Sequence, residues 1–369
     1  MELAALSDTY GDFYAPAFSV RVRAKDLMRD MLLAISQVEV TLVQGAMSSF
    51  SFTVVDAFDF ESRSFLTGSG DKVIDHLNFG AEVQICLGYG DSKSMPLMLS
   101  GVVSKIETSF PEAGSPELTI AGFDHAFPMS LGKNYRTWNN KTDTDVVREI
   151  ASLRNLAVDV DETKTREPKT EQNQQSDLEF LKKLAEKNSF ALYVDEHKVL
   201  HFHKPDKDSD PVVALRWGQG LLSFKPSANL AGQVTAVEVR AWDPKLKDKI
   251  VGTARAGSET DKGEGTSGGE KLGDFGQDSS KLPVLRVRLP VFNQAEADSR
   301  AKAMLDENAE KMLTGDAEAI GVPDIRVDCR VELKDLGTPF SRAYYIEEVT
   351  HKVDSSGYRT RFKVKERAL

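Results

Sequence analysis

The chain has 369 residues, of which 40% are hydrophobic and 28% are charged, and its formal net charge is -10 at pH 7. Because one compact core seldom serves a chain of this length, we expect two or three domains of an ordinary soluble protein. The negative charge, without any block of Lys and Arg, argues against specific nucleic-acid binding. No apolar run reaches the ~18 residues of a membrane helix, and the N-terminus lacks the pattern of a signal peptide.

The two cysteines, Cys86 and Cys329, lie far apart and show neither CxxC nor Cys/His spacing. This argues against a disulfide framework and against a structural zinc site. We expect both to be buried thiols.

The first part of the chain predicts a mainly antiparallel β domain. Apolar and polar side chains alternate in three segments between residues 17 and 60, and three more strand patterns follow, each bounded by turn residues. Between the first two segments, residues 25–35 suggest a short turn of amphipathic helix. Successive antiparallel strands of this kind favour a barrel.

A small α+β region follows. Its first helix begins after Thr142, which is placed as the N-cap, and its second follows a polar loop at 163–175. Ser176 and Glu179 form the capping box of that second helix. The next apolar segments predict a hairpin that turns at residues 195–196.

From Val212 the pattern returns to strands. Residues 256–282 are rich in Gly, Ser, Asp and Lys, and we expect a solvated, flexible loop there. A helix over 294–314 follows, capped by Asn293 and ended by Gly315.

The C-terminal segment predicts a strand and a long hairpin. A hairpin turn at 355–357 joins two alternating segments. The order of strand, turn and strand from residue 83 to 124 recurs from 327 to 364, which suggests two similarly built β domains. The expected strand before the hairpin places its apolar side chains on every second residue, at Ile325, Val327, Cys329, Val331 and Leu333.

These patterns together predict an α+β protein that is mainly β. We expect a first barrel domain at 1–135, an α+β domain at 136–210 and a second barrel domain at 211–369.

Five segments of the chain carry a family resemblance: Gly88–Gly90, Leu99–Val103, Gln172–Phe202, Val239–Pro244 and Tyr344–Phe362. They resemble the late control protein D family of contractile phage tails. Relatives of that family include the N-terminal part of VgrG and the hub proteins of extracellular contractile injection systems. The most specific segments are SDLEFLKKLAE and EVTHKVDSSGYRTRF.

The resemblance implies a structural baseplate hub protein without enzymatic activity, built from two tandem tube-like β-barrels with an inserted α+β domain. Such a protein forms a homotrimeric ring that adapts the six-fold tail tube to the three-fold spike. Its partners would be the tail tube protein, a separate spike protein, and baseplate wedge or other baseplate proteins. It would assemble in the bacterial cytoplasm and become part of a virion or contractile injection particle.

The sequence stops at Leu369, directly after the last expected strand. Relative to VgrG, it has no following OB-type module, no β-helical spike repeat and no segment for a lysozyme domain. We therefore expect the spike on another polypeptide.

Short motifs that match enzyme patterns lie in unsuitable contexts. GEGTSG at 263–268 fits GxGxxG, and GTSGG at 265–269 fits the nucleophile elbow by its letters. Both fall in the polar loop, without the strand and helix that such motifs need. Glu347 and Glu348 should point to opposite faces of a strand and so cannot share a substrate. We expect no catalytic and no cofactor-binding residue.

His197, His201 and His203 are the best metal candidates, because His201 and His203 would share one strand face. A zinc site also needs a third ligand and an orienting carboxylate, for which Asp195 or Glu196 would have to serve. We favour hairpin side chains without a ligand and expect no metal.

Aromatic residues offer a possible sugar-stacking surface at Tyr89, Trp217 and Trp242. Aromatics near strand ends are more often core or subunit-interface anchors, which we favour here. Two other functions stay open as alternatives, a cell-wall hydrolase and a carbohydrate-binding β protein. If copies of the chain enclose a channel, we expect excess Asp and Glu on its lining, which would repel DNA or an acidic cargo.

Overall fold

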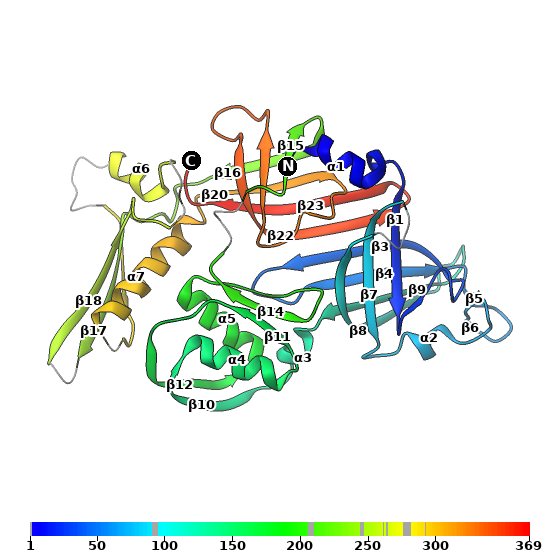
Figure 1. Ribbon diagram of the computed structural model, residues 1–369, viewed down its shortest axis with the longest axis horizontal. Helices are drawn as coiled ribbons and strands as arrows, with labels where there is room; N and C mark the ends of the chain where they lie inside the picture. The colour runs from blue at the N-terminus through cyan, green and yellow to red at the C-terminus, as the bar shows by residue number, and fades with distance from the viewer. Residues whose placement is uncertain are drawn as a thin grey trace.

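The computed structural model describes residues 2–90, 95–205, 210–243, 247–260, 262, 265–275, 282–291 and 293–369. A 13-stranded sheet runs through the molecule, with one smaller unit beneath it and another at the left end in Figure 1. Strands make up more of the described chain than helices do, as expected. None of the helices in the described part combines the length and apolarity that crossing a membrane requires.

The first half of the chain contributes an antiparallel sheet in the order β2-β1-β7-β8-β9-β4-β3. Within the described residues, its ladder does not return from β3 to β1, so hydrogen bonding leaves this half open. Buried side chains such as Val38, Phe52 and Ile120 alternate with polar ones and fill its concave side. The strands are β1 (Pro16–Val22), β2 (Lys25–Asp26), β3 (Ala34–Val43), β4 (Ser49–Val55), β5 (Phe58–Asp59), β6 (Ser64–Phe65), β7 (Glu82–Tyr89), β8 (Leu97–Ser109) and β9 (Glu117–Asp124).

The last part of the chain forms a closed barrel. Its strands pair in the order β22-β21-β15-β16-β20-β23, and β23 pairs back with β22. Strand β22 also pairs with β3, from Glu348 opposite Val43 to Val353 opposite Val38. The two halves are therefore one continuous sheet with one apolar core. The barrel strands are β15 (Val213–Trp217), β16 (Gly220–Ala228), β20 (Leu313–Ile320), β21 (Arg330–Lys334), β22 (Arg342–Asp354) and β23 (Gly357–Glu366).

A short N-terminal segment bridges the two halves. It consists of α1 (Leu3–Tyr10) and the 3-10 turn Gly11–Phe13, neither of which the sequence patterns predict. The Tyr10 ring lies 6.0 Å from that of Tyr89 in the first half, and its hydroxyl donates a hydrogen bond to Asp324 beside the barrel. The helix α2 (Val73–His76) lies at the other end of the first half.

The first smaller unit has its own apolar core, which includes Val147, Leu181 and Phe202. The expected N-cap at Thr142 and the expected capping box of Ser176 and Glu179 are confirmed, as is the hairpin that turns after Val194. Its elements are α3 (Phe127–Ser130), β10 (Asn134–Thr142), α4 (Asp143–Leu153), β11 (Ala157–Val160), β12 (Arg166–Gln175), α5 (Asp177–Asn188), β13 (Ala191–Val194) and β14 (Val199–His203).

The second smaller unit is a three-stranded sheet, β18-β17-β19, with α7 packed on one face. We expected its strands to belong to the second barrel domain, but they pair only with one another among the described residues. The unit comprises β17 (Ala236–Asp243), β18 (Asp248–Arg255), α6 (Gly268–Phe275), β19 (Val284–Arg288) and α7 (Gln294–Ala309).

Two expected elements are wrong in the second half. The apolar residues of the alternation at 325–333 are buried except for half-buried Cys329, but Asp328 is buried as well. Val322 to Cys329 form a loop, because Asp328 adopts a φ of +61° that a strand cannot continue through. Gly315 lies in β20 and does not end the helix, which stops at Ala309. A Cβ at Gly315 would lie 2.5 Å from the Phe224 ring, so close packing explains this glycine.

Three expected loops or turns also differ. Residues 25–35 contain no helix, and the polar segment 163–175 contains β12, whose buried residues include Gln172. Part of the expected loop at 256–282 is α6, because Ser267 and Glu270 cap its first turn in both directions. Residues 261, 263–264 and 276–281 of that segment lie outside the described part of the chain.

Cys86 is buried, as expected, whereas Cys329 is half-buried. The two segments that echo each other in sequence both form antiparallel triples, β7-β8-β9 and β21-β22-β23. The shared strand order agrees with the expected similarity of the two β regions.

Candidate assembly surface

The side of the sheet that faces away from the apolar core is polar across eight neighbouring strands, from β8 through β9, β4, β3, β22, β23 and β20 to β16. We call it the polar sheet face. It arises because the buried residues of each strand alternate with polar ones, as Val38, Val40 and Leu42 alternate with Glu39 and Thr41 on β3.

The register of the strands aligns these polar side chains in rows. The rows cross the seam between the two halves, which is the pairing of β3 with β22. One row joins Lys225, Asp316, Lys363 and Glu348, so charges alternate from strand to strand. Neighbours of opposite charge on adjacent strands stabilise a sheet.

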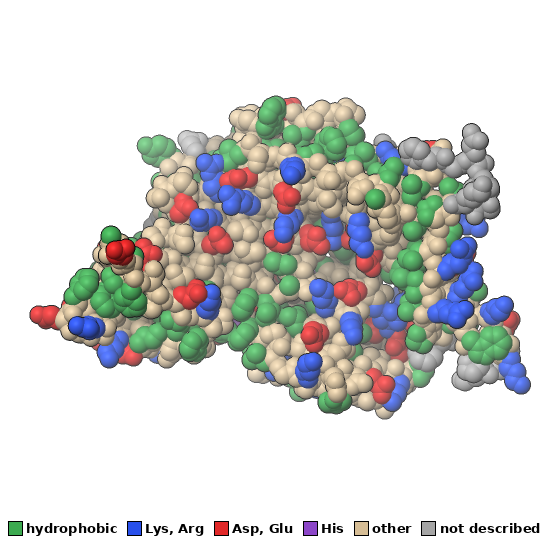
Figure 2. Space-filling view, turned by 180° about the vertical axis from the view of Figure 1, so that it is seen from behind, with side chains coloured by type: hydrophobic (Ala, Val, Ile, Leu, Met, Phe, Trp, Pro, Cys, Tyr) green, Lys and Arg blue, Asp and Glu red, His purple; other side chains and the backbone are tan. Residues whose placement is uncertain are grey.

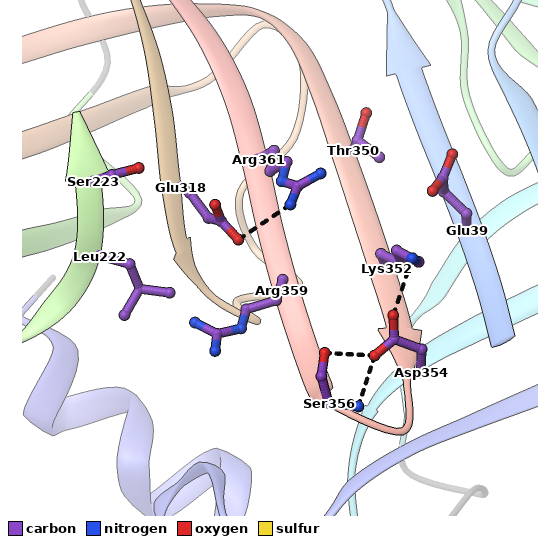
Figure 3. Close-up of a pocket in the computed structure, with 10 residues that line it drawn as sticks. All are labelled: Glu39, Leu222, Ser223, Glu318, Thr350, Lys352, Asp354, Ser356, Arg359 and Arg361. Atoms are coloured by element: carbon purple, nitrogen blue, oxygen red, sulfur yellow. Dashed lines mark hydrogen bonds and ion pairs between the residues drawn. The ribbon is translucent and has the colours of Figure 1, made fainter. Parts of the chain in front are cut away.

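Several contacts within these rows are direct. Lys363 lies 2.9 Å from Glu348 and Arg361 lies 3.5 Å from Glu318. At the seam, the hydroxyls of Thr41 on β3 and Thr350 on β22 are 3.0 Å apart. Figure 3 shows the Arg361 pair and the turn of the closing hairpin, where Asp354 accepts hydrogen bonds from Ser356 and pairs with Lys352.

A shallow hollow of about 380 Å³ lies on this face beside the hairpin turn. Charged and hydroxyl side chains line it, and most already have partners within the face (Figure 3). An open, polar hollow of this kind lacks the enclosed apolar lining of a small-molecule site.

The polar sheet face is nearly neutral. Across its strands seven basic and eight acidic side chains point outward. The basic ones are Lys105, Lys225, Lys352, Arg359, Arg361, Lys363 and Lys365, and the acidic ones are Glu39, Glu107, Glu117, Asp316, Glu318, Glu347, Glu348 and Asp354.

The α+β unit is fixed against both halves of the sheet. Arg326, in the loop before β21, pairs with Glu196 of the β13–β14 turn and donates to the carbonyl of Leu97 on β8 at 2.8 Å. Lys198 of the same turn lies 2.5 Å from Glu82 on β7. The turn of the expected β13–β14 hairpin therefore joins the α+β unit to the sheet.

The predicted histidine candidates lie at this junction. Asp159, His201 and His203 bring possible ligand atoms within 4.8 Å of one another, whereas His197 points to solvent on the turn. Both ring nitrogens of His201 have carboxylate partners, Asp159 at 3.2 Å and Asp195 at 3.1 Å. The His203 Nδ1 lies 2.7 Å from the Lys204 carbonyl oxygen, to which it donates.

Charge favours a proton over a metal ion at His201. Burial alone would lower the pKa of His201, but the hydrogen bonds and charges of Asp195 and Asp159 outweigh it and raise that pKa. When His201 is protonated, its two ring nitrogens donate to Asp159 and Asp195 and its positive charge lies between the two carboxylates.

The other predicted candidates lie far from one another. Glu347 and Glu348 do not alternate as expected, because a bulge after Ile346 lets both reach lysines on one face of β23. Tyr89 is buried in an aromatic cluster with Tyr358 and Phe13, while Trp217 on β15 and Trp242 on β17 are exposed on separate sheets. The GxGxxG segment lies partly outside the described residues, and the GTSGG letters lead into α6.

The fold has well-matched counterparts among solved structures. A 43 kDa tail protein of prophage MuSo2 from Shewanella oneidensis superposes with a TM-score of 0.71 at 13% identity, covering 96% of this chain and 99% of that one. The tail protein from Neisseria meningitidis MC58 gives a TM-score of 0.69 at 14% identity, with 96% and 97% covered.

A component of the E. coli type VI secretion system gives a TM-score of 0.57 at 8% identity, covering 94% of this chain and 76% of that one. At these identities the likeness concerns the fold, which this chain shares with phage tail and type VI secretion proteins. No curated protein sequence matches the chain.

One family model matches most of the sequence. It is described as the Alg8 N-terminal domain and covers residues 17–355. By the extent of this match, the chain belongs to the Alg8 N-terminal domain family.

Proposed function

We propose that this protein is a structural baseplate hub of a contractile tail or injection system, without catalytic activity. Three copies would form a ring that adapts a six-fold tail tube to a three-fold spike. The tail tube protein, a separate spike protein and other baseplate proteins would be its partners.

The continuous sheet is the observation that carries this proposal. Seven strands of the first half and six of the barrel form this sheet, and the pairing of β3 with β22 joins them. Two similar β halves in one chain give six such halves in a ring of three, which is what a match to a six-fold tube requires.

The polar sheet face supplies a lining for the ring. It spans eight strands across both halves and carries basic and acidic side chains in near balance. A surface of alternating charges that already pair with one another offers a passing macromolecule no large field of one sign. We therefore revise the expected acidic lining to a near-neutral one, which would still let cargo pass without sticking.

The proposal is tested by deletion of the gene in a producing strain. We expect electron microscopy of the deletion strain to show no complete sheathed particles, and expression of the chain in trans to restore them. Complete particles of normal number in the deletion strain would contradict the proposal. Release of peptidoglycan fragments by the purified chain would instead support a cell-wall hydrolase.

A further inference from the structure

The sheet β18-β17-β19 has one open face. Helix α7 covers the other, where Val237, Val239 and Ile250 pack against Ala297 and Leu305. The helix lies so close that a Cβ on Gly252 of β18 would be 2.1 Å from the backbone of Ala297. Because side chains alternate along a strand, the residues between those that pack on α7 point away from the helix.

The open face is strongly basic. Its strand register brings five basic side chains together around one acid, Glu238, which pairs with Arg240 and Arg286. We call this the basic face, and its cations are Arg240, Lys249, Arg255, Arg286 and Arg288. On a chain with a net charge of -10, such a concentration is unusual. Figure 2 shows Lys and Arg gathered at this end of the molecule.

Exposed apolar groups lie among these cations. The Trp242 side chain is 57% exposed and Val251 is 38% exposed, on the same face as Arg240. Trp and Arg together are typical of the energetically dominant part of protein interfaces.

The opposite end of the long axis has complementary chemistry. In Figure 1 the β5–β6 hairpin lies at the right end and the β17–β18 hairpin at the left. We call residues 56–76 and 108–116 the acidic tip. It carries two basic residues, Arg63 and Lys72, against six acidic ones, which are Asp56, Asp59, Glu61, Asp71, Asp75 and Glu112.

The acidic tip also exposes aromatic rings. Phe60 is 72% exposed and Phe110 is 62% exposed, and both pack on Phe58, at 5.3 and 5.5 Å between ring centroids. Phe65 completes the cluster at 5.1 Å from Phe58. Rings that are preassembled in this way lose little conformational freedom when a partner covers them.

We propose that the basic face of one copy docks on the acidic tip of a second copy of this chain. The two surfaces lie at opposite ends of the molecule, so the basic face cannot contact the acidic tip of the same copy. Contact between copies therefore runs head to tail. A head-to-tail contact closes into a ring when its rotation permits. This inference rests on the proposed function, in which copies form a ring, and assigns the surfaces that hold it.

The charged and the aromatic side chains have different roles in this contact. Opposite charges steer the encounter and fix which end meets which, whereas the aromatic groups stabilise the contact once water is excluded. Arg side chains over Phe60 and Phe110 would add cation–π attraction.

Photocrosslinking tests the contact. With benzoylphenylalanine at position 242 in place of Trp242, irradiation of the producing cells should give a crosslinked dimer. Mass spectrometry should map the linkage to the acidic tip. The matched control carries the same label at Trp217, which is also exposed but lies outside the basic face. Crosslinks from position 242 to a nucleic acid or to another protein would overturn the inference.

Charge reversal gives an independent test. R286E/R288E and E61K/E112K should each weaken association of the purified chain by about tenfold or more, and their combination should recover part of the loss. Mass photometry would follow the species at three times the 40.7 kDa monomer mass. K164E/K183E lowers the net charge by as much as R286E/R288E, on exposed residues of the α+β unit, and should have little effect.

A combined variant no better than either parent would overturn the inference, and so would a wild-type chain that stays monomeric. Neither result would bear on whether the deletion strain assembles particles. Failure of this contact is therefore distinct from failure of the proposed function.

Discussion

The His351 side chain lies on β22, the first strand of the closing hairpin formed by β22 and β23, and is fully buried. Its Nε2–H donates to the carbonyl of Ile325 at 2.9 Å, and its Nδ1 accepts from the Tyr358 hydroxyl at 2.9 Å and from Thr360 at 3.2 Å. Thr360 in turn accepts from the Val322 backbone. One neutral imidazole thus ties the loop before β21 to both strands of the hairpin.

Replacement of His351 by Phe should lower the free energy of unfolding by about 2–4 kcal/mol, because the Ile325 carbonyl and the Tyr358 hydroxyl lose their partners. Denaturant unfolding at pH 7.5 would measure this. Tyr358→Phe, the control, removes one donor and should cost about 1 kcal/mol.

The same residue predicts a loss of stability in acid. Burial lowers the pKa of His351 to about 3, below the ~6.5 of an unfolded histidine. Its contribution to stability is therefore present above pH ~6.5 and is lost as pH falls toward 3. Wild type should become less stable over that window, and His351→Phe should show a smaller decline. Equal slopes for the two proteins would contradict this role.

His201 should behave in the opposite sense. Burial alone would lower the pKa of His201, but Asp195 and Asp159 outweigh this effect and raise it. The contribution of His201 to stability is therefore fully present below pH ~6.5 and is lost as pH rises through the pKa of the folded state. We expect an NMR titration of His201 to give a higher pKa in wild type than in Asp195→Asn. An unchanged value in the variant would refute the ion pair.

The same ion pair predicts that zinc does not bind at His201 and His203. Calorimetric titration of the purified chain with zinc at pH 6 should show no stoichiometric binding. One equivalent bound, and lost in His203→Ala, would show instead that Asp159, His201 and His203 form a metal site.

At the scale of elements, α7 depends on a glycine in the strand beneath it. A Cβ at Gly252 would overlap the α7 backbone at Ala297, which cannot rotate away as a side chain can. Gly252→Ala should therefore destabilise the protein by about 1–3 kcal/mol. Gly273→Ala is the control, because nothing lies within 4 Å of its Cβ position in α6, and a helical alanine should stabilise by about 0.5–1 kcal/mol. Equal effects in thermal unfolding would argue against tight packing of α7.

Elements with strong local signals could be predicted from the sequence. The helices after Thr142 and Ser176 begin where the expected N-cap and the expected capping box place them. Ser267 and Glu270 have the same capping-box spacing, but the surrounding glycines and charges indicate a loop. Strand β12 gave no apolar alternation, because its buried Gln172 bonds to Asp177 and does not pack in an apolar core.

The surfaces depend on register, which the sequence does not provide. The alternation of strands β3 and β22 predicts a polar side for each, but only their pairing places Thr41 beside Thr350. The basic face was hidden for the same reason, since Arg240 and Arg286 are distant in sequence and become neighbours through the parallel pairing of β17 with β19.

At the scale of the whole molecule, both β halves share one apolar core, whereas the two smaller units have their own. We therefore expect hydrogen exchange in low denaturant to show the strands of both halves opening together, with the amides of α5 and α7 exchanging through smaller openings. Separate opening of β4 and β23 would mean that the β3–β22 seam does not couple the halves.

The central claim is that copies of this chain form the ring between tube and spike. Cryo-electron microscopy of purified particles tests it most directly. We predict three copies at the spike end of the tube, with the polar sheet face toward the lumen and the barrel and first half alternating around the ring. Particles that lack the chain at this position, or that turn the polar sheet face outward, would contradict the account.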